Sequence, residues 1–371
     1  MKYTRMPIEI ESPEQMGYEN IKYNLTESSF TDAVLKNLKI DISTLTLCYG
    51  HHVGKQELCA SIISESSILK PTDVLVTAGA AAGLFIVATS LLEKDSHILV
   101  VRPNYATNIE TPKAIGCEIS YLNLSFDNNF KLNINEVEKS IKKNTAYISI
   151  TAPHNPTGTI ISDEDLNKLI ALAEKNNLYL LVDETYRDLS FSQKLPIAAE
   201  LSEKVISVSS LSKAYGLPGI RIGWIITRDT NLQELFLAAK EQIYVCNSVV
   251  DEEIAYQFLQ NKTTILENVK LEVAEKRKIL DTWMLNNPYL GWIEPVGGVV
   301  CFPRIKQEIK IDIELFYQTL NKKFGTFVGP GHWFEQDKRY MRIGYGWPSK
   351  EELQMGLQNI SECFKLLLQS K

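Results

Sequence analysis

Short apolar runs alternate with helical stretches through residues 73–227, and this alternation restricts the fold more than any other feature. Segment 79–92 has the composition of a small-residue turn that opens an apolar helix, and 162–177 has Ser162 as a cap and Asp165 at the capping-box position. Strands that alternate with helices predict an α/β fold with a mostly parallel sheet covered on both faces. The predicted strands are 74–77, 98–101, 146–151, 178–182, 205–210 and 222–227.

The flanking segments have a different character. Residues 24–30 predict a loop that leads into a helix at about 31–39, and a second helix is expected near 58–63. After a helix-rich stretch at 231–285, the segments 292–305, 326–330 and 340–346 predict a short sheet, and an amphipathic helix closes the chain. We therefore expect a large domain at 45–270 and a smaller α+β domain formed by 1–44 and 271–371.

Composition excludes several classes of function. The formal net charge is −6, without a basic stripe, which argues against a nucleic-acid partner. No apolar run is as long as a membrane span, and the N-terminus lacks the apolar core of a signal peptide, so we expect a cytoplasmic protein without a membrane partner. The six cysteines are scattered without a Cys-x-x-Cys pair and indicate reduced thiols, and neither they nor the five histidines suggest a metal site.

The stretch SLSKAYGLPGIRIGW at 210–224 carries the most chemistry. Lys213 follows the fifth predicted strand, and a lysine used as a covalent anchor needs a dry pocket and nearby cations that lower its pKa. Ser210, Ser212 and Arg221 are the donors that would hold a phosphate. A lysine beside a phosphate cradle indicates pyridoxal 5'-phosphate (PLP), bound as a Schiff base.

Two earlier strand ends could serve the same cofactor. Ala80 and Ala81 follow the first strand at the start of a helix, where free N–H groups and the helix dipole favour a phosphate. The alternative is a tightly packed helix start. Tyr105 follows the second strand and is placed to stack on a flat ring, whereas in isolation a surface tyrosine is the simpler interpretation.

Two further strand ends carry polar groups suited to the ring itself. Asn155, in HNPTG, can donate to a ring oxygen, although the motif also fits a plain Asn-Pro turn. Asp183 directly follows the strand 178–182, and a carboxylate buried there needs a cation. A protonated pyridine nitrogen is such a cation, and an ordinary salt bridge is the alternative. Five strand ends in order thus carry parts of one PLP site.

These motifs give the chain a family resemblance. TAGAAAG, RPNY, HNPTG, VDETY, SLSKAYGLPGIRIGW, GGVVCFPR, VGPG and MRIGYG occur in the order found in class I/II aminotransferases of PLP fold type I. The resemblance covers about residues 45–365. It implies a large domain with a mostly parallel sheet plus a smaller α+β domain, and a homodimer with shared active sites.

The resemblance also implies roles for single residues. Lys213 would form the internal aldimine and shuttle the proton, and Tyr186 would donate to the ring 3-oxygen beside Asn155. Tyr49 would reach the phosphate in the other subunit. Arg342, in MRIGYG, would grip the substrate α-carboxylate with Asn155 nearby, a task that suits a guanidinium.

The implied activity is transfer of an amino group from an L-α-amino acid to a 2-oxo acid. A lyase or cyclase on the same scaffold is the alternative, since the chain also resembles capreomycidine synthase. A regulator's sensor domain would need a DNA-binding module, which we do not find in this sequence. Ser210-x-x-Lys213 also fits the β-lactamase motif, but the accompanying Ser-Asp-Asn and Lys-Thr-Gly elements are missing, and no Gly-x-Gly-x-x-Gly fingerprint is present.

The substrate side chain is less constrained by the sequence. No second arginine for a dicarboxylate stands out, although Arg102 and Arg187 stay open as candidates. His51 and His52 either face the substrate or lie in an exposed loop. We expect the segment 11–30 to lie over the site. Its acidic residues would then favour a basic substrate, and the alternative is that they form a solvated face. These residues are Glu11, Glu14, Glu19 and Glu27.

Overall fold

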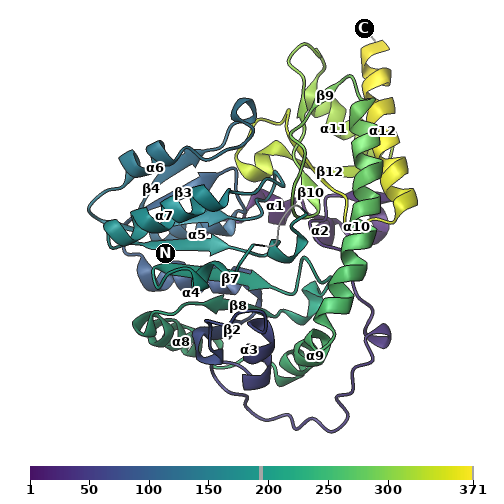
Figure 1. Ribbon diagram of the computed structural model, residues 1–371. Coiled ribbons are helices and arrows are strands. Elements are labelled where there is room, and N and C mark those ends of the chain that lie inside the picture. The colour runs from purple at the N-terminus through teal and green to yellow at the C-terminus, as the bar shows by residue number, and fades with distance from the viewer. Residues whose placement is uncertain (192–194, 370–371) are drawn as a thin grey trace.

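A seven-stranded sheet forms the centre of the protein in the computed structural model, which describes residues 1–191 and 195–369 (Figure 1). The strand order is β2-β8-β7-β6-β5-β3-β4, and only β8 runs antiparallel to its neighbours. The predicted α/β class with a mostly parallel sheet is confirmed. The strands are β2 (Val74–Thr77), β3 (His97–Arg102), β4 (Glu118–Asn123), β5 (Thr145–Thr151), β6 (Tyr179–Asp183), β7 (Val205–Ser210) and β8 (Gly223–Ile226).

Helices cover both faces of this sheet because side chains alternate along each strand. Val100 lies in a core with residues of α4 (Gly79–Leu91), α5 (Thr107–Ile115) and α8 (Thr230–Tyr244). Its neighbours Leu99 and Val101 lie in the opposite core with α6 (Ile134–Ser140) and α7 (Asp163–Lys175). The α7 cap forms as expected, with the Ser162 hydroxyl accepting from the Asp165 N–H at 3.1 Å.

A second sheet joins the two ends of the chain. It has the order β1-β12-β13-β10, and β1 (Tyr23–Leu25) pairs in parallel with β12 (Thr326–Pro330). The N-terminal segment is therefore built into the sheet formed by the C-terminal strands. The other elements of this part are β13 (Met341–Gly344), β10 (Val300–Cys301), the pair β9 (Leu290–Gly291) and β11 (Arg304–Ile305), and helices α10 (Lys262–Leu285), α11 (Ile313–Lys322) and α12 (Lys350–Gln369). Helices α3 (Gln56–Ile62) and α9 (Val249–Leu259) pack on each other near β2 of the central sheet (Figure 1).

Two expectations need correction. The helix expected at 31–39 is absent, and only a short 3-10 turn forms at Leu35–Asn37, within a segment that is largely extended. Strand β4 was not among the predicted strands, because it lies at the sheet edge and is only half-buried. The division at residues 44 and 270 stays a prediction, and α10 crosses the second boundary.

Two short helices, α1 (Pro7–Ile10) and α2 (Pro13–Met16), follow the N-terminus. Glu11, between them, accepts from the Trp333 indole N–H at 2.7 Å and pairs with the His332 ring at 2.8 Å. This attachment places α1 and α2 over the carboxyl ends of the central strands, where the candidate site lies. None of the helices in the described part of the chain is long and apolar enough to cross a membrane.

Candidate active site

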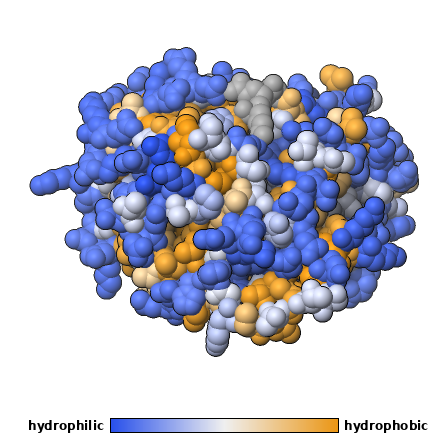
Figure 2. Space-filling view, turned by 60° about the horizontal axis from the view of Figure 1, so that its bottom comes forward, coloured by the Kyte–Doolittle hydropathy of each residue, from blue (hydrophilic) through white to orange (hydrophobic). Residues whose placement is uncertain are grey.

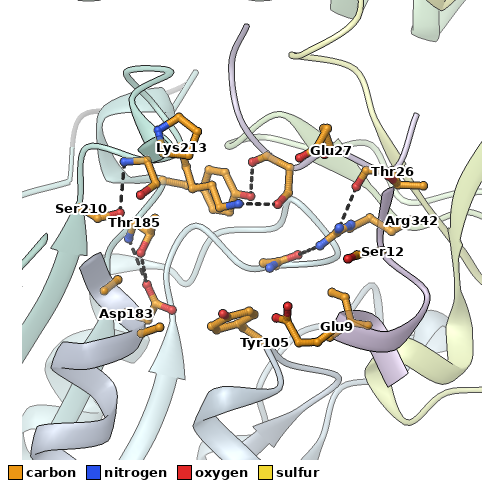
Figure 3. Close-up of a pocket in the computed structure, with 18 of the residues that line it drawn as sticks. Glu9, Ser12, Thr26, Glu27, Tyr105, Asp183, Thr185, Ser210, Lys213 and Arg342 are labelled. Carbon is orange, nitrogen blue, oxygen red and sulfur yellow. Dashed lines mark hydrogen bonds between the residues drawn. The ribbon is translucent and has the colours of Figure 1, made fainter. Parts of the chain in front are cut away.

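The polar residues expected at the strand ends meet around one cavity of about 250 Å³ (Figure 3). Parallel strands bring their carboxyl ends to one edge of the sheet, so residues far apart in the sequence converge there. Tyr49 does not line this cavity and is 85% exposed. The predicted residues that line it are Ala80, Ala81, Tyr105, Asn155, Asp183, Tyr186, Ser210, Ser212, Lys213, Arg221 and Arg342.

Lys213 presents its amine to the cavity and donates a hydrogen bond to the Ser28 hydroxyl at 2.9 Å. Burial lowers the pKa of this amine, and the Glu27 carboxylate opposes that effect. A lower pKa increases the fraction of neutral amine, which is the nucleophilic form. Tyr186 is also tied to this segment, since its hydroxyl donates to the Ser28 carbonyl.

Asp183 ends strand β6 and is buried. Its carboxylate accepts hydrogen bonds from the Thr185 N–H at 3.1 Å and the Thr185 hydroxyl at 2.5 Å. Burial raises the pKa of Asp183, and the bonds to Thr185 oppose this. Among residues 1–191 and 195–369, no cationic side chain forms an ion pair with it, although the charge of Lys213 also opposes the effect of burial on its pKa. A buried carboxylate without a cation is costly, so this position suits a positively charged ligand group.

The start of α4 and the residues around Arg221 form a compact donor cluster. Ala80 and Ala81 lie in the first turn of α4, where backbone N–H groups have no helical partner. Their methyl side chains add no donor, so any contact there uses the backbone. The Arg221 guanidinium lies so close to Gly79 that a Cβ on this glycine would be 2.5 Å from Nη2. Phosphate oxygens match this combination of N–H groups and guanidinium.

Gly223 keeps this donor cluster in place, and its substitution is a test. A Cβ on Gly223 would lie 2.4 Å from the Gly79 carbonyl carbon and 2.5 Å from the Ala80 nitrogen, both backbone atoms. We expect Gly223→Ala to lower the melting temperature and weaken cofactor binding, because overpacking of this kind costs about 1–3 kcal/mol. Gly219→Ala is the matched control, since a Cβ there meets no atom within 4 Å. Equal behaviour of the two variants in thermal unfolding and cofactor titration would contradict this view of the cluster.

Arg342 lies on β13, at the opposite side of the cavity from Asp183 (Figure 3). Its Nη2 donates to the Thr26 carbonyl at 2.7 Å and its Nη1 to Asn155 Oδ1 at 3.3 Å. The side chain is 4% exposed, and its Nε has no hydrogen-bond partner within the described residues. A buried N–H donor without an acceptor is rare, so the Arg342 guanidinium suits an anionic group as its ligand.

The N-terminal segment contributes more to the cavity than its sequence indicated. Glu14 and Glu27 line the cavity as expected for a segment that lies over the site, whereas Glu11 is bound to His332 and Trp333 and Glu19 lies outside. Glu9, Ser12, Thr26, Ser28, Thr151, Thr185 and Trp333 line it too and were not predicted. The acidic composition of the N-terminal segment was the only sequence feature that indicated a role in the cavity. Contacts between segments far apart in the sequence produce no local pattern from which they could be predicted.

The open candidates for side-chain recognition lie elsewhere. Arg187 is buried in an ion-pair cluster with Glu65 and Asp188, and Arg102 donates to Asn123 and lies over the Tyr121 ring. Neither lines the cavity. His51 and His52 line a separate hollow, where His52 is 2.6 Å from Glu241. In their own chain, these histidines do not face the candidate active site.

Comparison with known proteins assigns the chain to a family. Residues 19–360 match the family model for aminotransferase class I and II. The chain belongs to this family. Its structure is of PLP fold type I, as the solved structure of a PLP-dependent aminotransferase from Streptococcus suis shows: the two superpose with a TM-score of 0.91 at 27% identity, over 99% of each chain.

Two curated relatives carry different names. The chain is 30% identical to an aspartate aminotransferase from Pyrococcus horikoshii, over 79% of this chain and 75% of the relative. It is 26% identical to capreomycidine synthase from Streptomyces vinaceus, over 84% and 80% of the two chains. Both predicted resemblances are confirmed. Because aminotransferases and a synthase share this fold, membership of the family alone leaves the reaction open.

Pyridoxal 5'-phosphate is the cofactor that the family implies, and the residues in the cavity fit it. The fit rests on three separate features of the structure. They are a cavity-facing amine of lowered pKa at Lys213, a buried carboxylate at Asp183 that forms no ion pair with the described residues, and the donor cluster at the start of α4 beside Arg221. These features match the aldehyde, the ring nitrogen and the phosphate of the cofactor.

Proposed function

We propose that this protein is a PLP-dependent aminotransferase that moves an amino group from an L-α-amino acid to a 2-oxo acid. The observation that carries the proposal is the position of Arg342. Its buried guanidinium, whose Nε has no partner in the part of the chain that the structure describes, shares one cavity with the Lys213 amine, which suits an α-carboxylate next to the reacting amino group.

Each side chain of the cavity has a role in this proposal. Lys213 would hold the cofactor covalently, and its amine would move the proton that leaves the substrate Cα. When bound, the cofactor supplies the electron sink for negative charge at that carbon, and Asp183 keeps its ring nitrogen protonated. Tyr105 would stack on the ring and Asn155 would donate to its 3-oxygen, as would Tyr186 once its hydroxyl turns from the Ser28 carbonyl to the cofactor. The phosphate is held by Ala80, Ala81, Ser210, Ser212 and Arg221.

The alternative is a lyase or cyclase, which the similarity to capreomycidine synthase supports. The two reactions differ in what remains on the enzyme after one turnover. We therefore propose mixing holoenzyme with a panel of amino acids without any 2-oxo acid. Stoichiometric conversion of the cofactor to its pyridoxamine form, with one equivalent of 2-oxo acid, supports transamination. Repeated turnovers that release ammonia or a cyclised product would favour the alternative.

We further propose a homodimer with shared active sites, in the cytoplasm. Residues 38–55 form an extended loop at the lower edge of the view in Figure 1, and Leu47 and Tyr49 in it are 77% and 85% exposed. The face turned forward in Figure 2 carries several apolar patches among polar side chains. A second subunit would cover such surface, and Tyr49 would reach its phosphate site. Sedimentation velocity tests the assembly, and a monomer at micromolar concentration would contradict it.

A further inference from the structure

Carboxylates from three separate elements of the N-terminal segment line the candidate active site. Glu9 belongs to α1, Glu14 to α2, and Glu27 follows strand β1. Figure 3 shows Glu9 beside Tyr105, and Glu27 on the side of the cavity that holds Lys213 and Arg342. The Glu11 contacts with His332 and Trp333 attach α1 and α2 to the rest of the protein and keep Glu9 and Glu14 at the cavity.

The charges around the cavity do not balance without a ligand. The cationic side chains that line it within the described residues are Lys213, Arg221 and Arg342, and the anionic ones are Glu9, Glu14, Glu27 and Asp183. In the proposed function, Lys213 and Arg221 serve the cofactor, Asp183 faces the ring nitrogen, and Arg342 takes the substrate carboxylate. Lys213 and Arg342 are cationic neighbours of Glu27 in the structure. Once these two serve the cofactor and the substrate carboxylate, the three glutamates have no other cation of their own among the described residues that line the cavity.

Glu27 is the best placed of the three to bind a cation. The Tyr18 hydroxyl donates to its Oε1 at 3.0 Å and thereby orients the carboxylate. Burial raises the pKa of Glu27, while the neighbouring Lys213 opposes this effect. An ionised carboxylate accepts up to about four hydrogen bonds, so one hydroxyl leaves it capacity for a ligand. A positively charged ligand group would offset the cost of its desolvation.

A second observation points to the other end of the same ligand. Arg342 is buried and lines the cavity, and within the described residues its Nε has no hydrogen-bond partner, so the guanidinium suits an anion. A molecule with a carboxylate at Arg342 and a cation at Glu27 satisfies both groups at once. Such a molecule is an α-amino acid that carries an ammonium or guanidinium group on its side chain.

We propose that the amino donor of this enzyme has a cationic side chain, which Glu27 binds with support from Glu9 and Glu14. This inference rests on the proposed function, because Arg342 is taken to hold the α-carboxylate. The inference predicts a substrate different from that of the relatives named aspartate aminotransferase, because the second carboxylate of aspartate would be repelled by the three glutamates. Arg102 and Arg187, the open candidates for binding such a carboxylate, lie outside the cavity.

The test measures binding without turnover. The probe is 5-guanidinopentanoate, which has a carboxylate and a guanidinium but no α-amino group and therefore cannot be transaminated. Hexanoate is the uncharged-tail comparison. By isothermal titration to the holoenzyme, we expect 5-guanidinopentanoate to bind about tenfold to a hundredfold more tightly, the range typical of a charge-assisted hydrogen bond. Glu27→Gln is expected to remove most of this difference and to leave hexanoate binding unchanged.

Glu19→Gln is the matched control, because it removes the same charge from the same segment outside the cavity. It should leave the preference for the guanidino acid intact. Equal affinities of the two acids for the parent enzyme would overturn the proposal, as would an equal loss of preference in both variants. The visible absorbance of the bound cofactor reports whether Glu27→Gln is correctly folded.

Failure of the binding preference can be distinguished from failure of the proposed transamination. If the guanidino acid binds tightly but no amino acid converts the cofactor to its pyridoxamine form, transamination fails and the binding preference stands. If neutral or acidic amino acids convert the cofactor and cationic ones do not, transamination stands and this inference is wrong.

Discussion

Lys213→Ala should purify without the visible absorbance of a lysine-bound cofactor and should lose at least about 10⁴-fold in turnover, because one residue is both covalent anchor and proton carrier. The structure gives the reason for so large an effect. The Lys213 amine faces the cavity, burial lowers its pKa, and its position is fixed by the hydrogen bond to Ser28. An alanine retains none of these properties.

The control for this variant is Lys168→Ala, which removes a half-exposed lysine of α7 that is paired with Glu164. It should keep both the absorbance and the turnover of the parent enzyme. Circular dichroism verifies that both variants fold. Turnover of Lys213→Ala at the parent rate would contradict the entire account of the site.

Arg342→Ala should raise the KM for α-amino acids by about a hundredfold, because in the proposed function it removes the guanidinium that binds the α-carboxylate, and charge-assisted hydrogen bonds contribute about 1.5–3 kcal/mol each. The corresponding amines without a carboxylate should be affected far less. Steady-state kinetics with an amino acid and its decarboxylated counterpart measures the difference.

Arg342 also donates to the Thr26 carbonyl and to Asn155, so the alanine variant leaves these acceptors without their donor. Arg342→Lys controls for this by keeping a positive charge without the planar fork, and its KM should be intermediate. A similar loss of efficiency for the amino acid and the amine would show that Arg342 supports the fold and does not bind the carboxylate.

The sequence predicted the central sheet well because its strands are buried and continuously apolar. The polar residues that follow such strands converge by topology, so Asp183 and Lys213 could be placed in one site from order alone. Strand β4 is an edge strand with weaker burial, and the 31–39 segment has helical composition but is extended in the structure. Local propensity does not decide such segments.

The missing parts of the site come from long-range contacts. Ser28 contacts Lys213 although 185 residues separate them, and Arg342 reaches Thr26 across 316 residues. These contacts depend on the parallel pairing of β1 with β12, and no sequence pattern in either short strand predicts that the two pair. Glu9 was not predicted for the same reason. Its position at the cavity depends on the long-range contacts of Glu11 with His332 and Trp333.

Reduction of the holoenzyme with borohydride, followed by mass spectrometry of its peptides, tests the central claim most directly. Reduction makes the bond between lysine and cofactor permanent, so the labelled peptide identifies the anchor. Lys240 is the alternative candidate for the anchor, because it is fully buried and burial lowers its pKa to about 8. Its amine, however, donates to the His52 carbonyl, and the residue does not line the cavity. We predict one pyridoxyl label, on Lys213. A label on Lys240 or on any other lysine, or no label on a protein with bound cofactor, would contradict the account.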